Sequence, residues 1–171
     1  QNEIADNQID DDGNGFTDDV HGFNFVDYND DLSDTYGHGS MIAGILGASG
    51  NNETGTCGIS WNAKFMVIKI LNQNGVGSVA KAIAAIDYAR NHGAKIINAS
   101  WGYLASEINQ SSSKALFDAI SDAKNAGILF VSSVGNGDEN HVGLNNDIAT
   151  QSTYPSSYDL DNIVAVAAID N

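Results

Sequence analysis

Apolar residues alternate along most of the chain between short continuous runs and stripes at helical spacing. The runs predict strands at 64–71, 95–99, 128–131 and 163–167. The stripes predict two amphipathic helices, the first through Val79, Ala82, Ile83, Ile86 and Ala89 and the second through Leu116, Ala119, Ile120 and Ala123. Strands that alternate with helices form βαβ units, so the pattern predicts an α/β fold with a mostly parallel sheet flanked by helices.

The ends of the two helical stripes carry start and stop signals. Ser78 precedes the first stripe, and either Ser112 or Ser113 precedes the second, each in a position to act as an N-cap. Gly93 and Gly127 follow the stripes and are expected to end the helices.

The N-terminal part of the chain follows a different pattern. Residues 1–34 are polar, rich in acidic side chains and without period, which predicts a loop region. Residues 35–171 carry the βαβ pattern and begin with Met41–Ala48, a small and apolar segment that predicts a buried helix. We expect both regions to belong to one domain, because 171 residues is an ordinary domain length.

Composition and net charge exclude some classes of binding partner. The net charge of −15 argues against a nucleic-acid surface and against anionic membranes, and fits a protein that carries cations. No apolar run reaches the length of a membrane helix. The single cysteine, Cys57, allows no internal disulfide, and we expect it to be packed and inert. The chain begins with Gln1 and no apolar leader follows, so we expect it to be part of something longer.

An acidic loop near the N-terminus has the residue pattern of a calcium site. Asp10, Asp12 and Asn14 alternate and are followed by Gly15, as in the first half of an EF-hand loop. The carbonyl of Phe16 and the carboxylates of Asp18 and Asp19 can complete the oxygen shell, although His21 stands where an EF-hand has its bidentate Glu. Oxygen ligands favour Ca²⁺ over zinc or copper. A solvated acidic loop is the alternative.

Five segments together resemble the subtilisin-like serine peptidases, in the order of that family. They are Asp34-Thr-Tyr-Gly-His-Gly-Ser-Met-Ile-Ala-Gly44, Gly55-Thr-Cys-Gly-Ile-Ser-Trp-Asn-Ala63, Asn98-Ala-Ser-Trp-Gly102, Phe130-Val-Ser-Ser-Val-Gly-Asn-Gly137 and Tyr154-Pro-Ser-Ser-Tyr158. The resemblance implies a three-layer subtilisin-like fold, incomplete at both ends. Two residues depart from the family pattern, because Ser40 stands where Thr is usual and Met41 where a second His is usual.

The resemblance also implies roles for individual residues. His38 would be the general base, and Asn136 would donate its side-chain amide to the oxyanion. Peptide or protein substrate would lie along backbone walls made of Ser100, Trp101, Gly102, Gly75, Val76 and Gly77, with Ser133, Val134 and Gly135 lining the pocket for the residue before the scissile bond. Asn52 resembles a ligand of a second family calcium site, although a plain surface turn fits the same residues.

The family's catalytic Asp strand and its Gly-Thr-Ser-Met-Ala helix have no counterpart in these 171 residues. We therefore expect the chain to be inactive alone, to expose apolar surface and to self-associate. The leading hypothesis is a fragment of a secreted, calcium-stabilised serine endopeptidase. A catalytically dead relative that binds peptides is the alternative, and a nucleotide-binding module is disfavoured because no strand precedes a phosphate-binding glycine motif.

Overall fold

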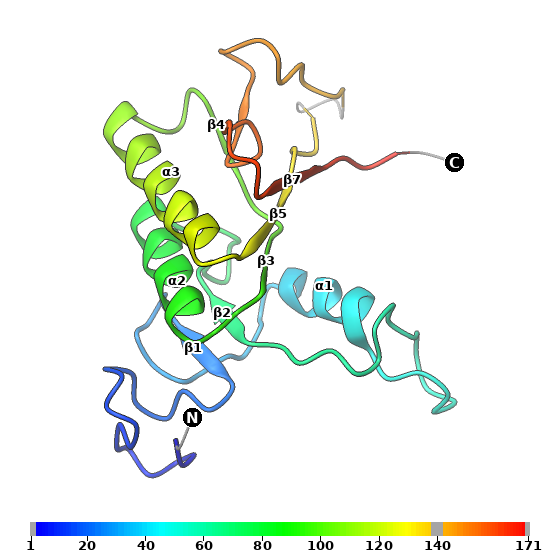
Figure 1. Ribbon diagram of the computed structural model, residues 1–171. Helices are drawn as coiled ribbons and strands as arrows, with labels where there is room; N and C mark the ends of the chain where they lie inside the picture. Colours follow the sequence, from blue (N-terminus) through cyan, green and yellow to red (C-terminus); the bar gives the residue numbers. More distant parts are fainter. Residues whose placement is uncertain (1–2, 138–141, 170–171) are drawn as a thin grey trace. The chain divides into compact units, whose positions relative to one another are not determined.

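The computed structural model describes residues 3–137 and 142–169. The chain divides between Lys81 and Ala82 into two compact units, which are considered separately below (Figure 1). Both units combine helices with parallel strands, so the predicted α/β class is confirmed. Most elements lie where the hydrophobic pattern predicts them, although the strands are shorter than the apolar runs.

The first unit is built around a short parallel pair of strands. Strand β1 (Gly22–Asn24) pairs with β2 (Val67–Lys69), and Phe23 is buried with its ring edge-on to that of Phe16, 4.8 Å between centroids. Gly22 has φ +132°, and a Cβ there would overlap the backbone of Val67. Only glycine therefore allows the two strands to approach this closely.

Strand β1 lies inside the stretch that was predicted to be loop, so this part of the prediction is wrong. The strand is three residues long, too short to show an alternating pattern. Its last residue, Asn24, is fully buried, and its side chain orders the turn that follows. The Asn24 Oδ1 atom accepts the amides of Val26 and Asp27, and its Nδ2 donates to the carbonyl oxygen of Asp31 at 2.9 Å. The polar contacts of Asn24 and the buried rings of Phe23 and Phe25 together hold this segment.

Helix α1 (His38–Gly47) forms where it was predicted, but it is not buried. Met41 and Ile45 are 64% and 61% exposed, and none of the residues of the helix is buried. The segment after the helix contacts only its C-terminal end, where Gly58 donates its amide to the carbonyl of Ala48. Among the described residues of the first unit, no layer covers the apolar face of α1. Cys57 is also exposed, so the expectation of a packed thiol is wrong.

The second unit contains a three-stranded parallel sheet in the order β3-β5-β7. These strands are β3 (Ile96–Ala99), β5 (Leu129–Ser133) and β7 (Ile163–Val166). Helix α3 (Gln110–Asn125) packs on β5 with the predicted stripe, whose four residues Leu116, Ala119, Ile120 and Ala123 are all buried. An antiparallel pair, β4 (Tyr103–Leu104) with β6 (Thr153–Tyr154), was not predicted, because each strand has only two residues.

The helix ends follow the expected capping chemistry with one correction. Helix α2 (Val79–Asn91) begins after Ser78, whose Oγ accepts the amide of Lys81 at 3.3 Å, as predicted. Helix α3 begins after Asn109, not after Ser112 or Ser113, because the Asn109 side chain accepts the Ser112 amide. The helix thus starts one turn earlier than the serines suggested. Within 3–137 and 142–169, none of the helices is both long and apolar enough to cross a membrane.

Candidate functional site

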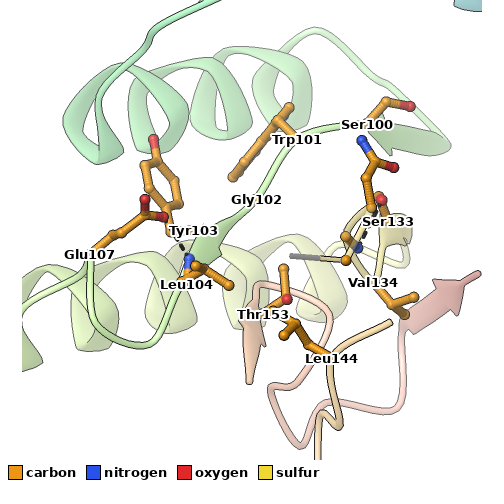
Figure 2. A pocket seen from close by; sticks show the side chains of 13 residues that line it. Ser100, Trp101, Gly102, Tyr103, Leu104, Glu107, Ser133, Val134, Leu144 and Thr153 are labelled. Carbon is orange, nitrogen blue, oxygen red and sulfur yellow. Dashed lines mark hydrogen bonds between the residues drawn. The ribbon is translucent and has the colours of Figure 1, made fainter. Parts of the chain in front are cut away.

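A cavity of about 300 Å³ in the second unit gathers all the site residues predicted for that unit (Figure 2). Its lining includes Ser100, Trp101, Gly102, Ser133, Val134, Gly135 and Asn136. These residues come from two segments more than thirty positions apart in the sequence. The structure therefore brings together the proposed substrate wall, the proposed pocket wall and the proposed oxyanion donor.

The parallel sheet explains why the two segments meet. Ala99, the last residue of β3, is in register with Ser132 near the end of β5, so both strands end at the same edge. Parallel strands present the loops at their carboxyl ends side by side, where α/β folds bind their ligands. Ser133 Oγ accepts the amide of Gly135 at 3.1 Å, which turns the chain toward Asn136. Asn136 itself is exposed, as a donor to an incoming ligand must be.

Several residues of this cavity were not anticipated from the sequence. They are Tyr103, Leu104, Glu107, Gly137, Leu144 and Thr153. Thr153 and Leu104 reach the cavity because β4 and β6 pair at its border. No spacing in the sequence signals such a contact, since the two strands are nearly fifty residues apart. Two of the six had a signal in the sequence, because Tyr103 follows the predicted Gly102 and Gly137 follows the predicted Asn136.

The first unit carries His38 as the first residue of α1. Its position depends on the carboxylate of Asp34, which lies under the first turn of the helix. Asp34 Oδ1 accepts the Gly37 amide at 2.8 Å, and Oδ2 accepts both the amide and the hydroxyl of Ser40 at 2.8 Å. These bonds satisfy donors that a helix start otherwise leaves open. These hydrogen bonds lower the pKa of Asp34 from 3.8 to about 2. The Ser40 amide makes the largest contribution, followed by the Gly37 amide and the Ser40 hydroxyl.

The Asp34 contacts predict a specific pH dependence. Because the folded pKa lies below the unfolded value, the carboxylate stabilises the helix start fully above about pH 4. That contribution is lost as the pH falls from 3.8 through about 2. We expect the protection factor of the Ser40 amide, which is its hydrogen-exchange rate corrected for the intrinsic pH dependence of amide exchange, to fall across this window, and NMR should follow it. In Asp34→Asn the dependence should disappear, whereas Asp159→Asn, at an exposed position, should keep it. A Ser40 protection factor insensitive to pH between 2 and 4 would contradict the assignment.

The predicted glycine wall of the first unit lies next to the histidine segment. Gly75 has φ +73°, and a Cβ there would lie 2.8 Å from Cζ of the Tyr36 ring. Tyr36 in turn has its ring 6.4 Å from that of His38. The structure thus places Gly75 beside the segment that carries His38, whereas Gly77 lies against Ile70 and Leu71. A turn over residues 72–75 precedes this contact, since the Gly75 amide donates to the Asn72 carbonyl at 2.9 Å.

The acidic loop brings carboxylates together as a cation site would require. Oxygen atoms of Glu3, Asp12 and Asp19 lie within 4.8 Å of one another. Asp19 is 1% exposed and accepts the Asn14 side-chain amide. Three carboxylates at this separation repel one another unless a cation lies among them, so the donor set fits Ca²⁺. Glu3 was missed from the sequence, because it lies outside the alternating pattern.

All of these carboxylates have protein partners in this structure, including Glu3, whose two oxygens accept the amides of Asp11, Asp12 and Asp18. Asp10 accepts the amides of Asn14 and Gly15, and Asp18 accepts the amides of Asn7 and Gln8. These bonds shape the loop around the three converging carboxylates, and Asn14 Oδ1 accepts the Phe16 amide. The carboxylate of Asp18 thus accepts backbone amides of the loop, whereas that of Asp19 lies with the converging carboxylates.

Asn52, the predicted ligand of a second calcium, lies in an exposed turn. Its side-chain oxygen accepts the amide of Thr54 at 3.2 Å, which is the geometry of an ordinary Asx turn. The structure therefore gives this residue a turn-forming contact, and its role in calcium binding stays a prediction.

Comparison with known proteins agrees with this arrangement. The profile of the subtilase family, peptidase S8, matches residues 3–171. Subtilisin-like protease 1 of Plasmodium berghei is 34% identical over 93% of this chain and 26% of its own length. Subtilisin DY of Bacillus licheniformis is 34% identical over 89% of this chain and 50% of its own length. The chain thus spans about a quarter to a half of these relatives.

Solved structures show the same likeness. A cold-adapted subtilisin-like serine proteinase matches with a TM-score of 0.58 and 26% identity, over 79% of this chain and 42% of that one. Sphericase matches with a TM-score of 0.59 and 28% identity, over 76% and 39%. The fold is therefore subtilisin-like, and the family match extends over nearly the whole chain. This chain belongs to the subtilase family.

Proposed function

We propose that this chain supplies the general base and the oxyanion donor of a secreted, calcium-stabilised serine endopeptidase. The observation that carries the proposal is the cavity that unites Ser100–Gly102, Ser133–Gly135 and Asn136. A peptide in extended form would add as a strand along the backbone of residues 100–102. No second function is favoured by a specific contact in the described part of the chain.

Each residue has a defined task in peptide-bond hydrolysis. The His38 imidazole takes the proton of an attacking serine hydroxyl and returns it to the leaving amine. The Asn136 side-chain amide donates to the oxygen that becomes negative in the tetrahedral intermediate, which is worth about 3–4 kcal/mol of barrier. The serine itself has no counterpart among these residues. The chain by itself is therefore proposed to lack turnover.

The acidic loop would hold the calcium ion through the carboxylates of Glu3, Asp12 and Asp19. A bound Ca²⁺ supplies positive charge that relieves the repulsion among these groups and ties the N-terminal loop to the fold. Secretion is consistent with this role, because calcium-dependent stability suits a compartment rich in that ion. The excess of acidic residues throughout the chain points the same way.

The substitution Asn136→Ala tests the proposal directly. In the full-length protein we expect kcat for a chromogenic peptide to fall about 10²–10³-fold, because the donor acts on the transition state and not on bound substrate. KM should change by less than about threefold. Steady-state kinetics with active-site titration by a fluorophosphonate gives both numbers.

Asn91→Ala is the matched control, since Asn91 is an exposed residue at the end of α2. It should leave both constants at the wild-type values. A wild-type protein that binds peptides yet neither cleaves them nor reacts with the fluorophosphonate would overturn the proposal. The chain would then belong to a peptide-binding member of the family.

A further inference from the structure

The sequence contains three asparagines that are each followed by a glycine, at 14–15, 74–75 and 136–137. Asparagine is a thermolabile residue, and glycine is the neighbour that shields its side chain least, because glycine has no Cβ. In such a pair the backbone nitrogen of the glycine can attack Cγ of the asparagine and expel the side-chain amide as ammonia. The third pair contains Asn136, the proposed oxyanion donor.

In the first two pairs the glycine amide is held by a hydrogen bond. Gly15 donates its amide to Asp10 Oδ2 at 2.8 Å, and Gly75 donates its amide to the carbonyl oxygen of Asn72 at 2.9 Å. A nitrogen whose proton is bound to an acceptor must open before it can attack a neighbouring carbon. These two pairs are therefore protected in the folded state.

The third pair lacks this protection. Within residues 3–137 and 142–169, neither the Gly137 amide nor the Asn136 side chain has a hydrogen-bond partner. Both residues lie outside the helices and strands, and Gly137 has a φ of +87°. Asn136 is exposed, so water and hydroxide reach its side chain. The folded chain thus leaves one of its three asparagine–glycine pairs open to reaction.

We infer that Asn136 deamidates spontaneously in the folded protein and that this modification limits the lifetime of the oxyanion donor. The second half of the inference rests on the proposed function, which makes Asn136 that donor. The Gly137 nitrogen forms a bond to Asn136 Cγ, the bond from Cγ to Nδ2 breaks, and ammonia leaves with the proton of the Gly137 amide. Water then opens the resulting succinimide ring at either carbonyl, which leaves aspartate or isoaspartate in place of Asn136.

Either product removes the donor from the cavity. Aspartate has no N–H to offer to the oxygen that becomes negative, and it adds a negative charge of its own beside that oxygen. Isoaspartate also carries the main chain through the former side chain, which displaces the loop. Loss of one oxyanion donor lowers kcat about 10²–10³-fold, so a modified molecule contributes almost no turnover. The activity of a sample then follows its fraction of intact Asn136.

The test follows the full-length protein during storage at neutral and at mildly alkaline pH, by mass-spectrometric peptide mapping after digestion in acid. The mapping uses His38→Ala, which is expected to be inactive and therefore does not digest itself. We expect aspartate and isoaspartate to accumulate at Asn136, faster at the higher pH because the attacking nitrogen must lose its proton. Conversion at Asn14 and Asn74 should be at least about tenfold slower, since their glycine amides must open first. In urea, where no amide is held, all three should convert at similar rates.

Variants of the neighbouring glycine test the attacking nitrogen. Gly137→Ala and Gly137→Asn add a Cβ beside it, and each should slow conversion of Asn136 at least about tenfold. Gly137→Asn is included because asparagine adopts a positive φ more readily than alanine. Gly143→Ala is the matched control, since a Cβ there meets no atom within 4 Å, and it should keep the wild-type rate. Thermal melting shows which variants are folded, and either variant of Gly137 carries this comparison if the other is not.

Activity is measured on wild type in parallel. The fractional loss of kcat should equal the converted fraction of Asn136, with KM unchanged, because the remaining turnover comes from unmodified molecules. No conversion at Asn136, or equal conversion of all three asparagines in the folded protein, would overturn the inference. Conversion without a matching loss of kcat would confirm the modification site and contradict the role of Asn136 as oxyanion donor. A fresh protein without peptidase activity would contradict the proposed function, whereas the mapping decides the deamidation separately.

Discussion

Replacing His38 by Ala is expected to lower the kcat/KM of the full-length protein for peptide substrates by on the order of 10⁶-fold. Without the imidazole, no group takes the proton from the attacking hydroxyl or returns it to the leaving amine. His38 lies at the first position of α1, held by Asp34 beneath the turn. Removing the side chain therefore leaves the backbone contacts of the helix start intact. Steady-state kinetics with a sensitive fluorogenic peptide measures the loss.

His21→Ala is the matched control, because His21 is exposed and contributes its backbone carbonyl to the amide of Val67. Its activity should equal that of wild type. Circular dichroism should show the same folded state for both variants. If His38→Ala retained a tenth or more of the activity, the assignment of the general base would be wrong.

Removal of calcium should lower the melting temperature of the full-length protein by about 5–10 °C. A ligand present at about a hundred times its dissociation constant stabilises the folded state by about 2.7 kcal/mol, and each kcal/mol shifts Tm by about 2–4 °C in a domain of this class. The carboxylates of Glu3, Asp12 and Asp19 converge within 4.8 Å and would repel one another once the ion is gone. Differential scanning calorimetry with and without a chelator measures the shift.

Variants locate the calcium effect in the acidic loop. Asp12→Asn and Glu3→Gln remove one converging charge each, and each should reduce the chelator-induced shift by at least about half. Asp159→Asn, an exposed carboxylate outside the loop, should leave the shift unchanged. An equal shift in all three variants would assign the ion to some other site. If the chelator left the melting temperature of the wild-type protein unchanged, the proposal that calcium stabilises it would be wrong.

The helices show which local signals suffice to predict structure. The stripe Leu116, Ala119, Ile120 and Ala123 predicted the buried face of α3, and all four residues are buried. A helical stripe repeats over several turns, so one sequence window contains the whole signal. The start of α3 was placed wrongly, because Asn109, Ser112 and Ser113 are all competent caps. Only the backbone geometry selects Asn109, whose oxygen accepts the amide of Ser112.

The short strands, and the burial or exposure of helix α1, depend on contacts with residues far away in the sequence. Strands β1, β4 and β6 have three, two and two residues, so no period could identify them. Each exists because a partner strand lies beside it. Helix α1 has an apolar sequence that predicts burial, yet Met41 and Ile45 are exposed. Burial depends on whether another layer covers the helix, and a sequence pattern describes only the helix itself.

The sequence by itself determined the α/β class, the two long amphipathic helices and the segments that carry His38, Asn136 and the acidic loop. It could do so because these features are local: a helical period, a glycine-flanked histidine, and acids at alternate positions. Tertiary structure alone decided that the ends of β3 and β5 line one cavity and that Glu3 joins Asp12 and Asp19. It also placed Thr153 between Gly102 and Gly135. Contacts between residues far apart in the chain depend on strand register and packing, which no single stretch of sequence contains.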